Sequence, residues 1–596
     1  MAACDPLREG DVGATYSLDY RKLGAVELRV PVDWAMDPFD ILNWRHHLLS
    51  LRWMDVLAPA VLRAFLVDFH DFHFIRKRAN PMVGSRIGDH TTTLRLENVG
   101  AFRAVFLALE DKDAVALCER LMREDMAALL SPEVYRPWHN HGVMADTAIL
   151  EALETLGTMV SDDANLREFV VRRGMASQAA LYDEAGTTRE HSVSYQEHNY
   201  PVVMRFLRAA AAGAADRQRV EKGLQRGSRL GLGQGLGQGL QQGLQEGLQQ
   251  DSQQDSQQDS QQDSQQDSQQ DFLAQASREM FSHFTRSNGQ FFPLGDSFRL
   301  PNRAILEAHP EIDPALVGTA EAGAGPERIY CKGGFFSYSR GAGAARVHFV
   351  ATGSWNSGRH KQDDDLSFCL ELAGNMIFDD PGYSDSAKPD VAKLLGSADV
   401  HSVVTVQGRP FGDRGQGPSG SSLREWSCHA GGFELRGSHS RIPGVIVRRC
   451  WTLTGNRLTL TDWIRVSDKV GAGKMGSAEG DVGASAGRRE GDGRSGPDRP
   501  DRPDGRSGLD GQACLGMHGF VLSPAVTFAE IDAGILILLK CDGRAVGVLR
   551  ATDDSGGWSA ATIPHVGTDR RQVGRTTRLV YTAPARFGHT FEFTFA

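Results

Sequence analysis

Two short strands are predicted by the stretch Val445-Ile-Val-Arg-Arg-Cys-Trp-Thr-Leu-Thr-Gly-Asn-Arg-Leu-Thr-Leu-Thr-Asp-Trp-Ile-Arg-Val466. Apolar and polar residues alternate on both sides of Gly455-Asn456, which is typical of strands that meet at a turn. Similar alternating segments occur at 346–352, 432–436 and 535–539. Together these segments predict an antiparallel β-sandwich over residues 328–596.

Two other segments have compositions that do not form a packed core. Residues 468–513 are rich in Gly, Asp, Arg and Pro, which predicts a disordered loop between two strands of the sandwich. Residues 223–271 contain Gly-Leu-Gln repeats and then five copies of Asp-Ser-Gln-Gln that begin at Asp251. This composition buries too little apolar surface to offset chain entropy, so a disordered insertion is predicted. A transient helix is the alternative, but the glycines oppose it.

The N-terminal half has a helical pattern. Apolar residues recur at helical spacing between about 42 and 213, and Pro and Gly residues separate the stripes. None of these helices is apolar enough to stand alone, so several must pack together. We therefore assign residues 30–222 to a helical domain and 272–327 to its last helices and a linker.

Length and composition exclude several classes of protein. A chain of 596 residues is long for a single core, so two domains are expected. The formal net charge of -10 argues against a general nucleic-acid binder. The eight cysteines include no C-x-x-C pair, which disfavours a zinc knuckle or a redox motif. The sequence has neither a signal-peptide h-region nor an apolar run of 18 residues. It therefore predicts a cytoplasmic protein without a membrane span.

Two polar clusters stand out in the helical half. Trp138-His-Asn-His-Gly-Val-Met-Ala-Asp146 precedes an amphipathic helix, where donors at a helix start are placed to bind an anion. The alternative is that Asn140 only caps the helix and the two histidines are exposed.

The second polar cluster is Arg189-Glu-His-Ser-Val-Ser-Tyr-Gln-Glu-His198. It combines groups suited to substrate contacts and proton transfer. A tyrosine base would need a nearby cation, because the reference pKa of tyrosine is about 10.

A third cluster lies in the predicted sandwich. Ser357-Gly-Arg-His-Lys-Gln-Asp-Asp-Asp-Leu-Ser-Phe368 runs into an alternating strand, and further Asp and His residues follow later strands. The cluster comprises His360, Asp363, Asp364, Asp365, Asp379, Asp380 and His401. Histidine and carboxylates at strand ends suit a divalent metal such as zinc. The alternatives are a solvated aspartate turn and a structural histidine.

The order of these motifs resembles the heparinase II/III family of polysaccharide lyases and its relatives among alginate lyases. The resemblance covers about residues 30–215 and 330–465. It rests on Asn140-His-Gly142, Glu190-His-Ser-Val-Ser-Tyr195, His360-Lys-Gln-Asp-Asp-Asp-Leu-Ser-Phe368, Asp380-Pro-Gly382 and His401-Ser-Val-Val-Thr-Val-Gln-Gly408.

This resemblance implies an α+β multidomain protein, with an N-terminal incomplete α/α toroid followed by a C-terminal antiparallel β-sandwich. It implies β-elimination on an acidic polysaccharide that contains uronate. Asn140, with His141, would neutralise the uronate carboxylate. Tyr195 and His360 would share the proton transfers, with Tyr195 as the acid toward the leaving oxygen and either residue as the base, depending on uronate stereochemistry.

The resemblance also suggests residues that bind substrate and metal. These are Arg86 and Glu190 for substrate, and Asp380 and His401 for a structural zinc or calcium. Many relatives carry His-x-His-x-Asp at the first strand, whereas Gln362 stands at the second histidine here. Glutamine is a poor zinc ligand, so the site either lacks a metal or relies on Asp364.

Family analogy also suggests a periplasmic or envelope location. Two other functions remain open: a catalytically inactive carbohydrate-binding or capsule or exopolysaccharide assembly protein, and a hydrolase that pairs Asp364 with Glu190.

Overall fold

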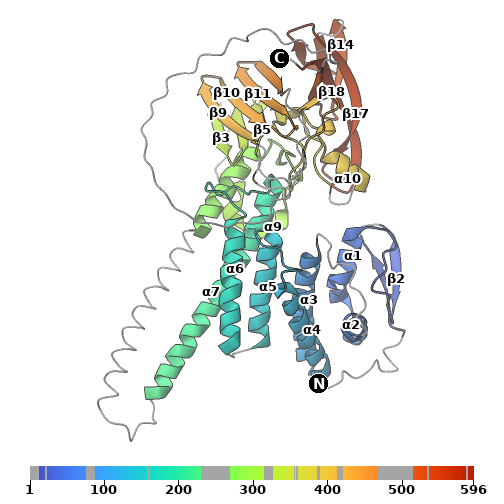
Figure 1. Ribbon diagram of the computed structural model, residues 1–596, viewed down its shortest axis with the longest axis vertical. Helices are drawn as coiled ribbons and strands as arrows, with labels where there is room; N and C mark the ends of the chain where they lie inside the picture. Colours follow the sequence, from blue (N-terminus) through green and yellow to red (C-terminus); the bar gives the residue numbers. More distant parts are fainter. Residues whose placement is uncertain are drawn as a thin grey trace. The chain divides into compact units, whose positions relative to one another are not determined.

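The chain forms two compact units (Figure 1). The computed structural model describes residues 13–20, 23–75, 87–157, 161–229, 269–314, 327–354, 356, 360–384, 389–412, 420–467, 514–532, 536–585 and 588–595. Unit 1 comprises Met1–Phe291 and Leu300–Ala322, and unit 2 comprises Phe292–Arg299 and Gly323–Ala596. The predicted loop at 468–513 lies outside the described residues. So does the predicted insertion at 223–271, apart from its ends at 223–229 and 269–271, which continue neighbouring helices.

Unit 1 is helical apart from one hairpin. Strands β1 (Thr15–Asp19) and β2 (Ala25–Arg29) pair antiparallel in front of the first helix. The helices are α1 (Leu42–Leu49), η1 (Arg52–Val56), α2 (Pro59–His70), η2 (Asp71–Ile75), α3 (Gly88–Ala108), α4 (Lys112–Leu130), α5 (Asn140–Leu156), α6 (Ser161–Ala179), α7 (Val193–Arg229), a helix at 269–284, α9 (Arg303–Ala308) and η3 (Pro310–Ile312). The predicted run of helices is therefore present, whereas the hairpin was not predicted. Within the described part of the chain, no helix has the length and hydropathy needed to cross a bilayer.

Helix α5 occupies the centre of unit 1. It packs against α3, α4, α6 and α7, and Val143, Ile149 and Leu150 on it are fully or almost fully buried. Asp146 is buried on the same helix and accepts hydrogen bonds from Tyr135 Oη at 2.9 Å and from Arg173. These bonds tie the loop before α5 to α6, so the first turn of α5 is held on two sides.

Unit 2 is built from three antiparallel sheets. The first contains β3 (Arg328–Lys332), β4 (Phe335–Arg340), β5 (Val347–Thr352), β6 (Phe368–Leu372) and β7 (Asn375–Phe378) in that order. The second has the order β17 (Gly557–Val566), β18 (Val573–Pro584), β13 (Leu515–Val521), β8 (Val404–Val406).

The third and largest sheet of unit 2 has eight strands. Their order is β14 (Val526–Asp532), β15 (Leu536–Cys541), β16 (Arg544–Ala551), β19 (His589–Phe595), β12 (Arg457–Val466), β11 (Val445–Thr454), β10 (Gly432–His439), β9 (Ser422–His429). Short helical segments η5 (Gly343–Ala345), α10 (Pro389–Leu395) and η6 (Ala398–Val400) lie in the connections.

The predicted hairpin forms the middle of this eight-stranded sheet. β11 and β12 pair in antiparallel register, with Thr454 opposite Arg457. Alternate residues of β11 point inward, so Val447 and Trp451 join a core with Phe349 and Phe433 from other strands. The pattern of the sequence therefore predicted these two strands.

Arg449 is the exception in that buried face. Its side chain is fully buried, and its guanidinium makes a two-pronged contact with Asp462 at 2.6 and 2.9 Å. Its Nη1 also donates to the carbonyl oxygens of Leu366 and Ser402, at 2.9 and 2.6 Å. One cation therefore joins β11, β12 and two chain segments outside the sheet.

We expect Arg449→Leu to destabilise unit 2 by about 3–5 kcal/mol, because it leaves Asp462 as a buried charge without its cation. Arg448→Leu is the matched control, since Arg448 is exposed on the same strand, and it should change stability by less than about 0.5 kcal/mol. Denaturant unfolding of both variants measures the difference. Equal stabilities would show that the Arg449 pair is not structurally important.

Candidate active site

The first turn of α5 places Asn140 in a fixed orientation. His139 precedes the helix in an extended conformation, and its Nδ1 accepts a hydrogen bond from the His141 backbone N–H at 3.1 Å. The same N–H also donates to Asn140 Oδ1 at 2.8 Å. Gly142 is required here, because a Cβ at this position would lie 2.4 Å from the carbonyl oxygen of Arg136. The Asn-His-Gly motif thus lets the preceding loop lie directly against the helix start.

Asn140 begins a chain of buried hydrogen bonds. Its Nδ2 donates to Asn199 Oδ1 at 3.2 Å, and Asn199 Nδ2 donates to Glu190 Oε2 at 2.9 Å. All three side chains are at most 2% exposed. Glu190 Oε1 is buried and has no hydrogen-bond partner among the described residues. Among the described residues, one amide hydrogen of Asn140 and one oxygen of Glu190 therefore have no hydrogen-bond partner in this chain.

A stack of imidazole rings lies beside Asn140. The His141 ring stacks on His90 at 4.8 Å and contacts His139 at 4.3 Å, and His90 stacks on His46 at 5.0 Å. Burial, and next the charge of a protonated His141, hold the pKa of His90 well below its usual range. The alternative in which Asn140 is only a cap and both histidines are exposed is therefore wrong, because His139 is buried and His141 is mostly covered.

Asp89 determines how His141 is oriented. Its Oδ1 lies 3.2 Å from His141 Nδ1, and its Oδ2 lies 3.8 Å from Arg136 Nε. An ionised carboxylate only accepts hydrogen bonds. In the neutral ring of His141 the hydrogen therefore lies on Nδ1, and Nε2 carries none. Asp89 lies in the second residue of α3, far from the motif in sequence, and no local pattern indicated it.

Tyr195 lies in the first turn of α7. Its ring is half-buried, and its backbone N–H donates to Ser192 Oγ at 3.3 Å. Tyr195 and Asn199 are four residues apart on the helix, so they lie on the same face. The loop before the helix is held by Gln196, which contacts the Thr188 N–H, the Gly186 carbonyl and Ser277. Asn140, His141 and Glu190 are therefore linked by hydrogen bonds through Asn199, and Tyr195 lies one helical turn before Asn199 on α7.

His360 lies in unit 2 and has a carboxylate partner. Its Nδ1 lies 3.0 Å from Asp296 Oδ2, and the His360 side chain is 22% exposed. Gln362 Nε2 donates to the other oxygen of Asp296 at 2.7 Å. Gln362 therefore holds the aspartate that orients His360. Asp296 lies 64 residues before His360 in the sequence, and sequence reasoning did not identify it.

Strained backbone occurs in the candidate motifs. Trp138, His191 and His360 have φ values of 57°, 57° and 51°. This left-handed conformation costs non-glycine residues on the order of 1–3 kcal/mol and is concentrated at functional sites. The same conformation occurs at six other non-glycine residues of the described chain, so it does not by itself identify a site.

The aspartate run of unit 2 is an ion-pair network. Lys361 Nζ lies 2.5 Å from Asp364 and 3.3 Å from Asp365, and Arg441 contacts Asp365 and Asp363. Burial alone would lower the pKa of Lys361, but the two aspartates outweigh it and raise that pKa. The alternative of a solvated turn is therefore wrong for Asp364 and Asp365, which are at most 2% exposed. Their charges are already balanced by protein cations.

The matched family model covers the segment that carries these residues. Residues 329–475 match the model described as heparinase II/III-like, C-terminal. This segment is therefore similar to the C-terminal domain of heparinase II/III-like proteins. The predicted resemblance to the heparinase II/III family is confirmed. Among curated proteins, none matches this sequence significantly.

Solved structures of heparinases share the fold of this chain. A heparinase III structure has a TM-score of 0.60 at 11% identity, over 97% of this chain and 80% of that one. A mutant of the heparan sulfate lyase HepC from Pedobacter heparinus has a TM-score of 0.55 at 11% identity, over 98% and 81%. The predicted fold, an incomplete α/α toroid followed by an antiparallel β-sandwich, is confirmed at this level. Identities this low show the fold alone.

The metal residues predicted for the heparinase II/III-like domain contact each other. His401 Nδ1 lies 2.9 Å from Asp380 Oδ2, both side chains are fully buried, and Ser367 also donates to Asp380. Nε2 of His401 is buried without a hydrogen-bond partner among the described residues. However, the described residues contain no group of three His, Cys, Asp or Glu side chains arranged to hold a metal ion. A structural zinc needs about four ligands, so these two residues do not make up a zinc site.

Asp379, the neighbour of Asp380, takes part in a second ion-pair network. Its carboxylate lies 3.1 Å from Arg299 Nη1 and 3.1 Å from His565 Nε2. Burial would raise the pKa of Asp379, but Arg299 and His565 hold it well below its usual range. Asp379 is therefore committed to partners within the protein, of which Arg299 is the cation. Arg86, predicted to bind substrate, lies outside the described residues.

We expect His401 to titrate above the ordinary histidine pKa of about 6.5. Burial lowers the pKa of His401, but Asp380 outweighs it and raises that pKa. The stabilisation by this pair is therefore complete below about pH 6.5 and is lost as the pH rises through the folded pKa. An NMR titration of ¹³C-labelled histidines, with His401→Gln for assignment, measures the value. A pKa below the ordinary one would contradict the charged pair.

Proposed function

We propose that this protein is a polysaccharide lyase that cleaves a uronate-containing acidic polysaccharide by β-elimination. The observation that carries the proposal is the buried chain from Asn140 through Asn199 to Glu190, next to Tyr195, in a protein with the heparinase III fold. The groups along this chain have fixed positions and unused hydrogen-bonding capacity. Such preorganised groups suit the binding of an anion whose charge changes during a reaction.

The first requirement of the reaction is to neutralise the uronate carboxylate. The proton at C5 is only weakly acidic, and removing it places charge on the adjacent carboxylate. Asn140 offers its remaining amide hydrogen at the positive end of α5, and protonated His141 would add a second donor. The tautomer imposed by Asp89 makes Nε2 the atom of His141 that gains this proton.

The second requirement is a base and an acid. At neutral pH tyrosine keeps its proton, so Tyr195 suits donation to the leaving glycosidic oxygen. His360 takes the proton from C5, or Tyr195 does so as a phenolate stabilised by a nearby cation and then passes that proton on, depending on the stereochemistry of the uronate. The C4–O bond then breaks, a C4–C5 double bond forms, and the leaving oxygen gains the proton that Tyr195 gives. The products balance without water.

Hydrolysis by paired carboxylates is disfavoured by the state of Asp364. A hydrolase needs one carboxylic acid and one carboxylate at the scissile bond. Asp364 is 2% exposed and lies 2.5 Å from Lys361 Nζ, so it is committed to a buried ion pair. A purely binding protein would have no physical need for a tyrosine and a carboxylate-oriented histidine, which favours the enzyme.

We expect the wild-type protein to release products that absorb in the ultraviolet when it is mixed with an acidic polysaccharide from a panel of heparan sulfate, alginate and bacterial capsule. The absorbance comes from the unsaturated uronate that elimination leaves. Tyr195→Phe should lower this rate at least about 100-fold, since a positioned acid contributes roughly 10²–10⁴-fold. Reducing ends without absorbance would indicate hydrolysis instead, and binding without either signal would indicate the non-catalytic alternative.

We expect Asp296→Asn to change the pH profile of that activity while leaving the fold intact. The variant removes the negative charge beside His360 but keeps a side chain of the same shape, so the pKa of His360 should fall. The basic group in the rate profile should move to lower pH, and the rate near neutrality should fall about tenfold. Asp390→Asn is the control, because it makes the same change at an exposed carboxylate in the first turn of α10. An unchanged profile would remove Asp296 from the mechanism.

A further inference from the structure

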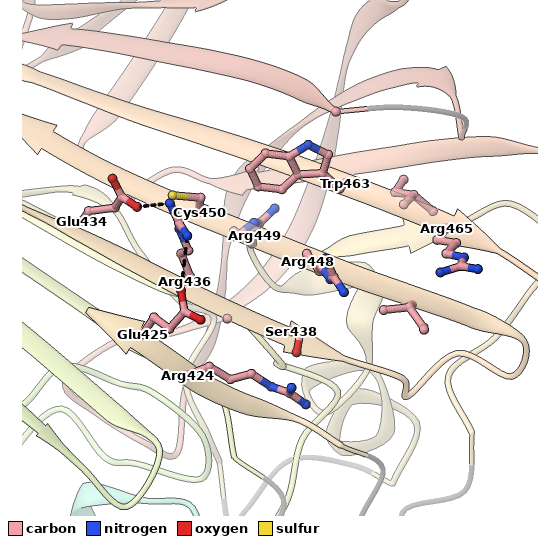
Figure 2. A pocket seen from close by; sticks show the side chains of 14 residues that line it. Arg424, Glu425, Glu434, Arg436, Ser438, Arg448, Arg449, Cys450, Trp463 and Arg465 are labelled. Atoms are coloured by element: carbon pink, nitrogen blue, oxygen red, sulfur yellow. Dashed lines mark hydrogen bonds and ion pairs between the residues drawn. The ribbon is translucent and has the colours of Figure 1, made fainter. Parts of the chain in front are cut away.

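A second polar surface lies on unit 2, apart from the residues proposed for catalysis. It is a groove of about 1100 Å³ on the strands β9, β10, β11 and β12, and we call it the sheet groove (Figure 2). Its lining comprises Arg424, Glu425, Glu434, Arg436, Gly437, Ser438, Ile446, Arg448, Arg449, Cys450, Trp463, Ile464, Arg465 and Gly588. No function described so far uses it.

The strand register places a positive and an aromatic group side by side in the sheet groove. Arg448 is directly opposite Ser438 on β10 and opposite Trp463 on β12. Arg465 is opposite Ile446, so it is a diagonal neighbour of Arg448. Diagonal neighbours across antiparallel strands are roughly 7–8 Å apart, which long side chains span easily. The two guanidinium groups therefore form one positive site next to an indole.

The charges in the sheet groove are not balanced. Arg436 is paired with Glu425 at 3.2 Å and with Glu434 at 2.6 Å, as Figure 2 shows, and buried Arg449 is paired with Asp462. Arg424 contacts only a hydroxyl, that of Ser422 at 3.0 Å, in the described structure. Arg448 and Arg465 have no carboxylate partner among the described residues. Three unneutralised arginines thus share one groove in a chain of net charge -10.

Apolar groups in the groove are exposed beside these arginines. Trp463 is 44% exposed and Ile446 is 42% exposed. A Cβ at Gly588 would lie 2.7 Å from Trp463 Nε1, so the glycine makes room for the indole to lie over the end of the neighbouring strand. An exposed indole next to arginines is typical of a binding surface, because it offers a flat apolar face and keeps its N–H available.

These features favour one class of ligand. Arginine binds carboxylate and sulfate through two parallel hydrogen bonds, and a tryptophan face packs against the C–H face of a sugar ring. A linear chain with both kinds of group is an acidic polysaccharide. Duplex nucleic acid fits less well, because it requires a larger basic surface than three arginines provide.

We propose that the sheet groove is a second binding surface that holds a segment of acidic polysaccharide without taking part in its cleavage. The class of glycan rests on the proposed function, whereas the existence of the surface rests on the arginines and Trp463. Two linked contacts on one polymer raise its overall affinity, so the groove should matter for long chains and not for short ones.

The test is binding by the full-length protein in a Tyr195→Phe background, which prevents turnover. The probes are heparan sulfate and alginate, with neutral dextran as the negative control, measured by affinity electrophoresis. Adding Arg448→Ala and Arg465→Ala together should weaken binding of at least one acidic polymer about tenfold, which corresponds to modest losses at two exposed charges. Arg544→Ala with Arg550→Ala is the matched control, because it removes equal charge from exposed positions of β16.

Three further measurements make the outcome decisive. Trp463→Ala should also weaken polymer binding, and Arg448→Lys with Arg465→Lys should weaken it less than the alanine pair, since charge is kept but paired hydrogen bonding is lost. Without the Tyr195 change, the alanine pair should cleave a tetrasaccharide at the wild-type rate.

Two results would overturn the proposal even if the lyase activity is found. One is that the groove variants and the control variants bind equally well, and the other is that the protein binds neither acidic polymer. Tighter binding to duplex DNA than to the glycans would overturn the glycan assignment. If lyase activity is absent but binding depends on the groove, the surface stands and the proposed function fails.

Discussion

The buried guanidinium of Arg449 is the constraint on which unit 2 depends. A cation inside a sandwich is costly unless it is paired and hydrogen-bonded, and here Asp462 and the carbonyls of Leu366 and Ser402 accept four hydrogen bonds from the guanidinium. Leu366 follows the aspartate run, and Ser402 follows His401. The same cation therefore joins the sheet to the segments that carry His360 and His401. Satisfying one charge gives these segments a defined position against a β framework.

Unit 1 uses the same principle at a helix end. The first turn of α5 has unpaired backbone donors, and the chain surrounds it with polar side chains that bond to one another. Asn199 is the central member, because it accepts from Asn140 and donates to Glu190. In the imidazole stack beside it, burial and next the charge of a protonated His141 hold the pKa of His90 well below its usual range. Each polar group thus has one orientation, which is the condition for binding an anion without reorganisation.

Much of this organisation was predictable from the sequence. Period-two alternation predicted β11 and β12, and helical spacing predicted the helices of unit 1, because both patterns report which faces are buried. The Asn-His-Gly and Glu-x-x-x-x-Tyr motifs identified Asn140, His141 and Glu190, which hydrogen bonds through Asn199 link. Asp89, Asn199 and Asp296 were missed, since each acts on a motif residue at least 50 positions away in the chain. The three aspartates after Gln362 suggested a metal site or a turn, and only the approach of Arg441 reveals an ion-pair network.

The sequence by itself determined the two kinds of unit, their order along the chain and the identity of the motif residues. These properties follow from local periodicity and residue type, which are encoded in neighbouring positions. The tertiary structure decided which charges are neutralised, which tautomer His141 adopts and which arginines of the β9–β12 face have no carboxylate partner among the described residues. Those properties depend on the environment that distant segments create around each side chain, because hydrogen bonding and burial act through space and not along the chain.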